Sequence, residues 1–412
     1  MRRVAVLLLV ALLPASARAQ EPSPPPEPFA GIQAMLDRRA EAMLASDEAA
    51  FMATIDRADP AFVRRQRLLF DGFQRIGLAA YRLEVTDRYW PELTTDLEVS
   101  EYGAAADPTV LHVEERYRLR GFDPQPALDD LFLTFVRRGG EWLMASDTDL
   151  SDLTVYTARK LWEFGPIETQ RSEHFLYVSH PDLRSAGGAI LASAEQALDI
   201  VIEAWPLPWS RRVVLLAPST TGELRRIIQA TFDLDVFVAF AYSSLDRAVD
   251  YDLTGHRVIF NWPNFSRYTE ETQQSILAHE LLHVATREDT GPMVPTFVEE
   301  GIADWVGGSG LSSLIGRVDA GDFDRRLPRD HEFITGSSED ILLSYDESLA
   351  AATYAEQRYG IRAVARMYRL LGDVRLAVGT PVHHVHRAMR SALGTGLERF
   401  ESGWADWVME SL

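Results

Sequence analysis

Residues 279–283 read His-Glu-Leu-Leu-His, an arrangement whose side chains can hold a metal ion and use it. On a helix, His279 and His283 occupy one face a single turn apart, because four positions separate them. Two neutral imidazoles supply two of the three protein ligands of a catalytic zinc site, whose fourth position stays open to water. Glu280 lies beside the same face, where its carboxylate is placed to accept a proton from that water.

A second acidic segment, Glu-Glu-Gly-Ile-Ala-Asp, follows at 299–304. Glu300 and Asp304 are again four apart and share a helix face. We predict that Glu300 is the third metal ligand and that Asp304 accepts the ring N–H of a ligating histidine, with His279 as the preferred partner. Gly301 removes a side chain where two helices must approach closely. For this segment alone a solvated acidic face would be favoured, but not beside the first motif.

The elements that must position these residues are two helices. We predict the first over about 269–287, with Thr269 as its N-cap, and the second over about 296–306, opened by Pro295. The first helix is mostly apolar and is expected to be buried, so its charged side chains need a partner. The alternative is that both histidines are core residues bonded to backbone, while Glu280 reaches solvent.

Together the two motifs resemble the gluzincin zinc peptidases, which join His-Glu-x-x-His on one helix to a glutamate ligand on a later one. The segment 297–305, Phe-Val-Glu-Glu-Gly-Ile-Ala-Asp-Trp, is most similar to the bacterial peptidase MA-like families. The resemblance covers roughly residues 150–412. It implies one Zn²⁺ per chain, held by the two histidines and Glu300, and peptide-bond hydrolysis with Glu280 as the general base.

Such peptidases also need a hydrogen-bond donor, commonly Tyr or His, for the oxyanion of the tetrahedral intermediate. The spacing Tyr345-x-x-Ser348, followed by Tyr359-Gly360, is similar to a stretch after the third ligand in the MA-like families. We therefore assign Tyr345 as the candidate donor, with His331 as the alternative. Tyr345 fits a core position at a helix start equally well, and the two interpretations stay open.

Three further histidines, His383, His384 and His386, have spacings that suit no single helix face. We interpret them as part of a solvated stretch or surface turn and exclude them from the site. No Gly-x-Met-Glu-Asn segment precedes the first histidine motif, which disfavours a dedicated aminopeptidase. Substrate identity and endo- versus exo-cleavage stay open.

The N-terminus has the pattern of a secretory signal peptide over residues 1–19, with two arginines, an apolar run and Ala17-Arg18-Ala19 as a small-x-small cleavage site. Residues 20–29 are rich in Pro and Glu and are predicted to be an extended tether. We therefore expect an exported protein, periplasmic or extracellular after cleavage near Ala19. The apolar run is too short to span a bilayer, and no membrane anchor is expected.

The composition restricts both the metal site and the partners. The 412 residues include no Cys, so disulfides are excluded and a metal must be held by His and carboxylate groups. A formal charge of −20 repels nucleic acid and anionic lipid, so neither is expected as a partner. The expected partner is a peptide or protein substrate, and the oligomeric state is left open.

Hydrophobic patterning predicts an α+β chain in two parts. Residues 30–150 show helical spacing and then alternating strands with a Gly139-Gly140 hairpin, and resemble a ketosteroid-isomerase-like cone in outline. Residues 151–412 show a mixed sheet lobe followed by a helical lobe that carries the metal-binding helix. By resemblance to gluzincins, the strand at 256–261 should lie at the sheet edge beside the cleft and pair with an extended substrate.

The prediction is a secreted zinc peptidase, and two other interpretations compete with it. The first is a catalytically inactive relative that uses the cleft as a binding module, although the intact Glu280 argues against it. The second is ligand binding by the cone-like part, with residues 151–412 as a scaffold.

Overall fold

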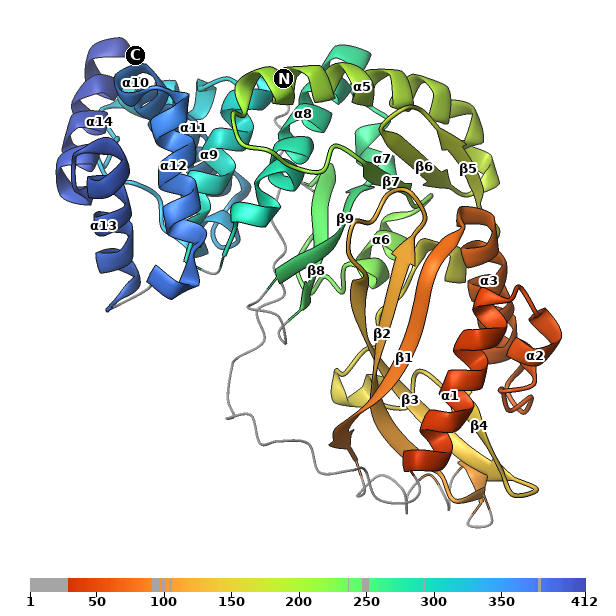
Figure 1. Ribbon diagram of the computed structural model, residues 1–412. Coiled ribbons are helices and arrows are strands. Elements are labelled where there is room, and N and C mark those ends of the chain that lie inside the picture. The colour runs from red at the N-terminus through yellow and green to blue at the C-terminus, as the bar shows by residue number, and fades with distance from the viewer. Residues whose placement is uncertain are drawn as a thin grey trace.

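The computed structural model describes most of the chain, namely residues 29–90, 97, 101–103, 106–235, 237–246, 252–291, 293–376 and 379–412. The expected signal peptide, and all but the last residue of the expected tether, lie outside the described residues. The fold is α+β, as predicted, with one antiparallel and one mixed sheet and a helical C-terminal part (Figure 1). Among the described helices, none combines the length and apolar character needed to cross a bilayer.

Helices and an antiparallel sheet form the N-terminal part, which we call the sheet-and-helix layer (Figure 1). Asp59 begins the long helix α3 by accepting hydrogen bonds from the amides of Ala61 and Phe62. Gly139 and Gly140, both at positive φ, make the predicted turn between β3 and β4. In chain order the elements are α1 (Phe29–Leu44), α2 (Glu48–Met52), α3 (Pro60–Ile76), β1 (Leu78–Tyr89), β2 (Thr109–Leu119), β3 (Ala127–Arg138) and β4 (Glu141–Ser146).

A five-stranded mixed sheet follows, in the order β5-β6-β7-β9-β8. Strands β6, β7 and β9 are parallel, while β5 and β8 run antiparallel to their neighbours. The parallel strands β6 and β7 are buried throughout, as expected for strands covered on both faces. The elements are β5 (Glu168–Arg171), β6 (Phe175–Ser179), α5 (Gly187–Ala204), β7 (Val213–Ala217), α6 (Thr221–Ile227), β8 (Ala239–Asp246), β9 (Asp252–Phe260) and α7 (Trp262–Phe265).

The strand order corrects one prediction. The strand expected at 256–261 belongs to β9, which pairs with β7 on one side and β8 on the other, so it is interior. Among the described strands, the edges of this sheet are β5 and, on the side of the hairpin, β8. The reason is that β8 and β9 form an antiparallel hairpin, and the second strand of that hairpin returns between β8 and β7.

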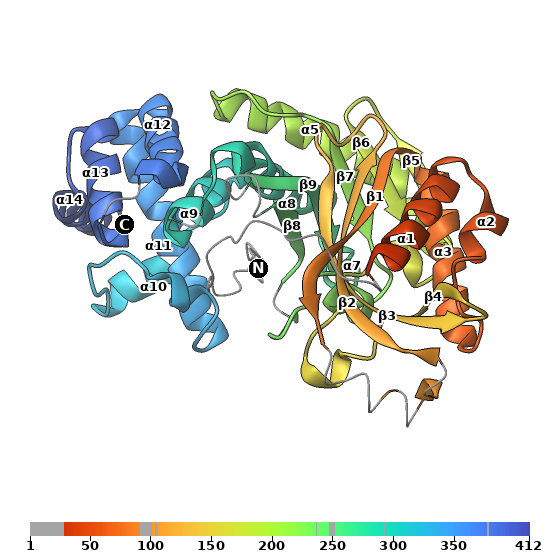
Figure 2. The ribbon, with the colours of Figure 1, turned by 60° about the horizontal axis from the view of Figure 1, so that its bottom comes forward.

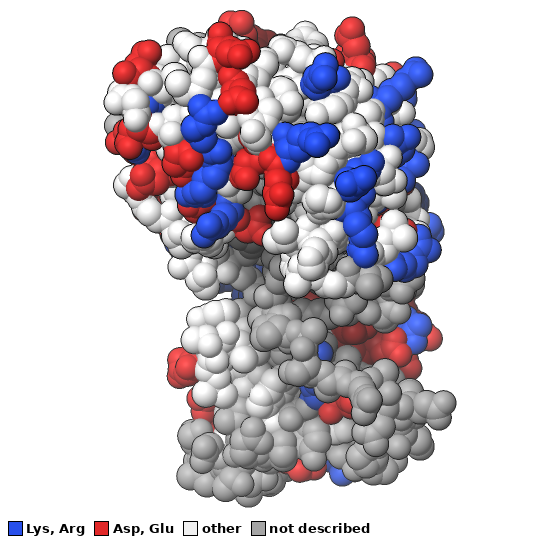
Figure 3. Space-filling model, turned by 90° about the vertical axis from the view of Figure 1, so that its left-hand side faces the viewer, with Lys and Arg blue, Asp and Glu red and all other residues white. Residues whose placement is uncertain are grey.

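The C-terminal part is a helical lobe in which α8 lies against the hairpin and the later helices stack beyond it (Figure 2). Basic and acidic side chains are interspersed on its outer face, which is the upper half of Figure 3. The helices are α8 (Glu270–Thr286), α9 (Thr296–Gly307), α10 (Ser312–Ala320), α11 (Ser338–Tyr359), α12 (Ile361–Gly372), α13 (Pro381–Leu393) and α14 (Leu397–Ser411). The two predicted helices therefore exist within one or two residues of their expected ends.

One continuous hydrophobic core joins the sheet-and-helix layer to the mixed sheet. A buried ion pair crosses this boundary, because the guanidinium of Arg257 on β9 donates to both carboxylate oxygens of Asp123 at 2.5 and 2.8 Å. Beyond the predicted boundary at 150/151, Thr157 still bonds to the backbone of Phe132 in β3. The two parts thus pack as neighbours rather than as separate cores.

The interior of the sheet-and-helix layer holds paired polar side chains among its apolar core residues. Lys160 forms ion pairs with Glu115 and Asp129, and Arg39 donates to Thr54 at 2.9 Å. The cavity in this region has a volume of about 20 Å³, which is room for about one water molecule. This cavity therefore offers no chamber for an organic ligand, which weakens the interpretation of the layer as a ligand-binding cone.

Candidate metal centre

Two helices bring the predicted ligands together. Helix α8 begins at its N-cap Thr269, whose hydroxyl accepts from the Thr272 amide, and it carries both histidines. Helix α9 packs against it and carries Glu300 and Asp304. All the predicted site residues on these helices are buried. Gly301 makes the close approach that was predicted for it, because a Cβ there would lie 2.2 Å from the backbone oxygen of Ser348 on α11.

The ligand atoms converge as a metal site requires. The Nε2 atoms of His279 and His283 are 3.1 Å apart, and Glu300 Oε2 lies 3.4 and 3.6 Å from them. Bonds of about 2.1 Å at a tetrahedral angle place neighbouring ligand atoms roughly 3.4 Å apart. Neither Glu300 oxygen makes a hydrogen bond to the protein, so an otherwise costly buried carboxylate is left facing this point. These three residues can therefore hold a divalent cation.

Asp304 orients the first ligand. Its Oδ1 lies 3.0 Å from Nδ1 of His279. Because the carboxylate can only accept, Nδ1 of the imidazole carries a proton, and Nε2 is the ring atom left to bind a metal. Ser309 donates a second hydrogen bond to the same oxygen at 2.9 Å, and Gly307 lets the end of α9 approach His279, since a Cβ there would lie 3.2 Å from the His279 Cβ. Sequence reasoning missed Ser309 and Gly307.

Opposite ionisation tendencies distinguish the two buried glutamates. Burial alone would raise the pKa of Glu300, but the electrostatic attraction of the two imidazoles, 3.4 and 3.6 Å away, lowers it to about 2. Burial above all, together with the charge of Glu300, raises the pKa of Glu280 to about 8, against the opposing effect of His279. Burial lowers the pKa of His283, which favours the neutral imidazole that binds metals. Glu300 is thus the carboxylate that stays anionic, as a candidate ligand requires, and Glu280 is the one that can exchange a proton near neutral pH.

The edge strand β8 lies next to Glu280. Neither carboxylate oxygen of Glu280 makes a hydrogen bond of ordinary geometry, but the backbone amide of Ala241 is near enough to lower its pKa. The Ala241 carbonyl accepts a hydrogen bond from Arg287 at 2.8 Å. Arg287, at the end of α8, is itself buried. The metal-binding helix and the edge strand are therefore tied together beside the candidate base.

Tyr345 on α11 is the candidate donor that the structure brings to the site. It is buried, its ring packs against Phe333, and its hydroxyl has no hydrogen-bond partner. Burial, and then the charges of Glu300, Asp304 and Glu280, raise its pKa well above the usual value, which keeps the proton on the hydroxyl. The alternative, His331, is exposed on the short helix η7 (Asp330–Phe333).

A second layer of polar groups lies behind the ligands and was not predicted. Glu299 accepts a hydrogen bond from the Tyr368 hydroxyl at 3.3 Å, and Tyr368 also bonds to Thr286 and Thr290. Tyr368 comes from α12, far along the chain, so no local spacing signals its presence. Of the two acidic residues before Gly301, Glu300 therefore faces the other candidate ligands and Glu299 faces this network.

The three histidines excluded from the site lie on α13, so the expectation of a surface turn is wrong. Thr380 caps this helix and Pro381 occupies its first turn. Both residues favour a helix start, but the prediction relied on the spacing of the histidines alone. His384 is buried and its ring bonds to the Leu371 carbonyl at 2.9 Å, while His383 is exposed. Their exclusion from the metal centre agrees with this arrangement.

No protein-family model and no curated protein sequence matches this chain. The function therefore has to be inferred from the site itself.

Proposed function

We propose that this chain is a zinc-dependent peptidase of the gluzincin type. One observation carries the proposal: a buried His-His-Glu cluster of metal-binding geometry lies beside a second buried carboxylate, that of Glu280, whose oxygens have no hydrogen-bond partner of ordinary geometry. A cluster that only stabilised the fold would not need this buried carboxylate without a partner. Zinc is proposed because imidazole and carboxylate ligands in a three-residue set are typical of catalytic zinc.

His279, His283 and Glu300 would hold the ion, which when bound supplies Lewis-acid polarisation of the scissile carbonyl and activation of water. Glu280 accepts the proton of the attacking water on its unpaired carboxylate and delivers it to the leaving amine. A pKa that burial raises to about 8 suits a group that must both take and release a proton near neutral pH. Tyr345 donates its hydroxyl proton in a hydrogen bond to the developing oxyanion.

For the substrate we propose an extended peptide that lies along β8. This strand is one of the two edges of the mixed sheet, and its residue Ala241 lies beside Glu280, so an added strand would bring a peptide bond near the base. We place the activity outside the cytoplasm on the signal-peptide pattern alone.

The deciding experiment uses Glu280→Gln in the full chain. Wild-type protein should carry about one zinc per chain, cleave an unfolded protein, lose activity to a chelator and regain it with Zn²⁺. Glu280→Gln should keep the zinc and lose at least about 100-fold in turnover, the contribution typical of a general base. Glu271→Gln, an exposed position on the same helix, is the matched control and should retain full activity.

Two results would reject the proposal. Normal turnover by Glu280→Gln would remove this residue from the reaction. Bound zinc without cleavage of any member of a diverse peptide library would favour the interpretation of an inactive, peptide-binding relative.

A further inference from the structure

A second cavity lies between the sheet-and-helix layer and the mixed sheet, and it shares no residue with the metal centre. Its volume is about 770 Å³, within the range of small-molecule sites. Helix α3, the segment 147–164 and the segment 223–231 contribute its lining. Ligand sites occur preferentially at such boundaries between packed units, since both sides contribute side chains.

The cavity is basic although the chain is strongly acidic. Its lining holds five arginines against three carboxylates, a formal excess of two positive charges in a chain of net charge −20. The arginines are Arg64, Arg65, Arg159, Arg225 and Arg226.

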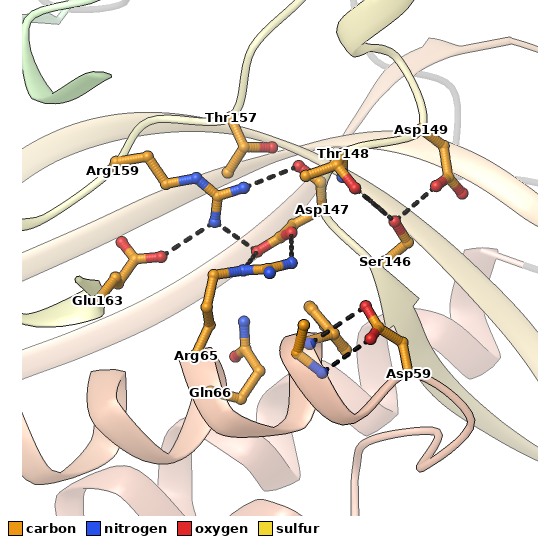
Figure 4. A network of polar contacts seen from close by, with 12 residues as sticks. Asp59, Arg65, Gln66, Ser146, Asp147, Thr148, Asp149, Thr157, Arg159 and Glu163 are labelled. Carbon is orange, nitrogen blue, oxygen red and sulfur yellow. Dashed lines mark hydrogen bonds and ion pairs between the residues drawn. The ribbon is translucent and has the colours of Figure 1, made fainter. Parts of the chain in front are cut away.

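The three carboxylates are already engaged by the protein, and Figure 4 shows the contacts of two of them, Asp147 and Glu163. Asp147 accepts from Arg65 at 2.6 Å on one oxygen and from Arg159 at 2.5 Å on the other. Glu163 accepts from Arg159 at 3.1 Å and from a backbone amide at 2.8 Å. Glu223 caps α6. These acids fix two of the arginines in place and do not neutralise the others.

The remaining three arginines keep N–H groups that make no hydrogen bond to the described part of the chain. Arg64 on α3 is exposed and makes no hydrogen bond or ion pair with any residue that the structure describes. Arg226 lies over the Phe164 ring at 4.6 Å and donates only its Nε, to the Gly222 carbonyl. Arg225 donates one terminal nitrogen to two backbone carbonyls. The stacking and backbone contacts hold Arg225 and Arg226 in place while leaving terminal N–H groups available.

We propose that this cavity binds a small organic anion with at least two phosphate or carboxylate groups. Arg64 on α3, together with Arg225 and Arg226 at the end of α6, provides the free guanidinium groups, whose planar forks match both kinds of oxyanion. The rings of Tyr156 and Phe164 line the same cavity and offer contact to an apolar portion of the ligand. This site stands apart from the proposed peptidase activity and does not depend on it.

The test titrates the full chain with pyrophosphate and, separately, with the tricarboxylate tricarballylate, by calorimetry at constant ionic strength. Saturable binding of one anion per chain is expected for at least one of them, and the tighter one identifies phosphate or carboxylate as the natural group. Arg64→Gln/Arg226→Gln should weaken binding by about tenfold or more, since each lost charged hydrogen bond is worth about that factor. The control Arg358→Gln/Arg362→Gln makes the same charge change at two exposed arginines of the helical lobe and should leave the affinity unchanged.

Absence of saturable binding by both anions would overturn the proposal. So would binding that the cavity variant and the control variant weaken equally, because that result reports net charge or the metal centre rather than this cavity. Thermal unfolding of both variants in buffer checks that neither substitution disturbs the fold.

Discussion

At the scale of single residues, the surroundings of two buried glutamates shift their pKa values in opposite directions. The pKa of Glu300 falls to about 2 and that of Glu280 rises to about 8, although both side chains are fully buried. The difference arises because two imidazoles offset the burial of Glu300, whereas burial and the like charge of Glu300 outweigh His279 at Glu280. Pairs of titratable groups with separated pKa values are the mark of an assigned acid–base role. If the histidines were only core residues bonded to backbone, nothing would explain why the two glutamates have such different pKa values.

The first prediction at this scale concerns Asp304. Asp304→Ala should weaken zinc binding or activity by roughly 10- to 100-fold, because the His279 ring loses the carboxylate that fixes its tautomer. Asp304→Asn keeps an acceptor oxygen and should cost less. Zinc affinity is measured by competition with a chromophoric chelator, and an unchanged affinity in Asp304→Ala would remove this residue from the site.

The second prediction concerns His256 on β9. Burial first, and then the charges of Arg287 and Arg257, lower its pKa to about 3, while Ser243 bonds to its ring at 2.9 Å. The unfolded chain binds a proton at this residue below about pH 6.5, and the folded chain does so only near pH 3. Above pH 6.5 the burial of His256 therefore costs the free energy of unfolding nothing. As the pH falls from 6.5 toward 3, the free energy of unfolding decreases by about 1.4 kcal/mol per pH unit.

Urea unfolding of the wild type and His256→Gln at pH 6, 5 and 4 isolates this contribution. As the pH falls, the free energy of unfolding of the wild type should decrease faster than that of His256→Gln, by about 1.4 kcal/mol per pH unit. His383→Gln, an exposed position on α13, should run parallel to the wild type. Parallel curves for His256→Gln as well would show that His256 is not held neutral.

At the scale of elements, the sequence predicted which segments are helices and strands better than how they are ordered. The ligand helices were predictable because capping residues and four-residue spacings are local signals that survive folding. The edge position of β8 was not, since hydrophobic alternation defines a strand but not its neighbours in the sheet. For the same reason the contacts of Arg287 and Tyr368 escaped prediction: each is a tertiary contact that no spacing along the chain encodes. Ser309, five residues after Asp304, is a local contact at the end of α9 that the motif spacing did not include.

Gly301 provides the prediction at this scale. In Gly301→Ala the new methyl group meets the Ser348 backbone oxygen, so α9 and α11 must separate. We expect a loss of about 1–3 kcal/mol in the free energy of unfolding, and weaker zinc binding because Glu300 moves with α9. Gly316→Ala is the matched control, since its Cβ meets nothing within 4 Å in the middle of α10.

The control should stabilise the protein by about 0.5–1 kcal/mol, the usual advantage of Ala over Gly inside a helix. Urea unfolding of both variants decides the matter. Equal stability of the two variants would mean that the α9–α11 approach is not as close as described.

At the scale of the whole molecule, the layer that the sequence set apart as an accessory domain is joined to the rest by buried charges. Composition and alternation predicted helices followed by an antiparallel meander, the order that the structure has, but they carry no information about what its interior holds or what it packs against. The single lysine of the chain, Lys160, shows why: it follows the predicted boundary yet pairs with Glu115 and Asp129 of the layer. Such long-range pairs exist only once both parts are folded.

The Asp123–Arg257 ion pair tests whether this junction matters for stability. Asp123→Ala leaves the Arg257 guanidinium buried without its partner and should cost about 3–5 kcal/mol in the free energy of unfolding. Adding Arg257→Met should recover part of this loss, because an apolar side chain of similar length replaces an uncompensated charge. Glu141→Ala, which breaks the exposed contact with Arg38, should change stability by less than about 1 kcal/mol. If Asp123→Ala is as mild as the exposed control, the two parts are held together by their shared apolar core alone, and the buried charges serve only to align them.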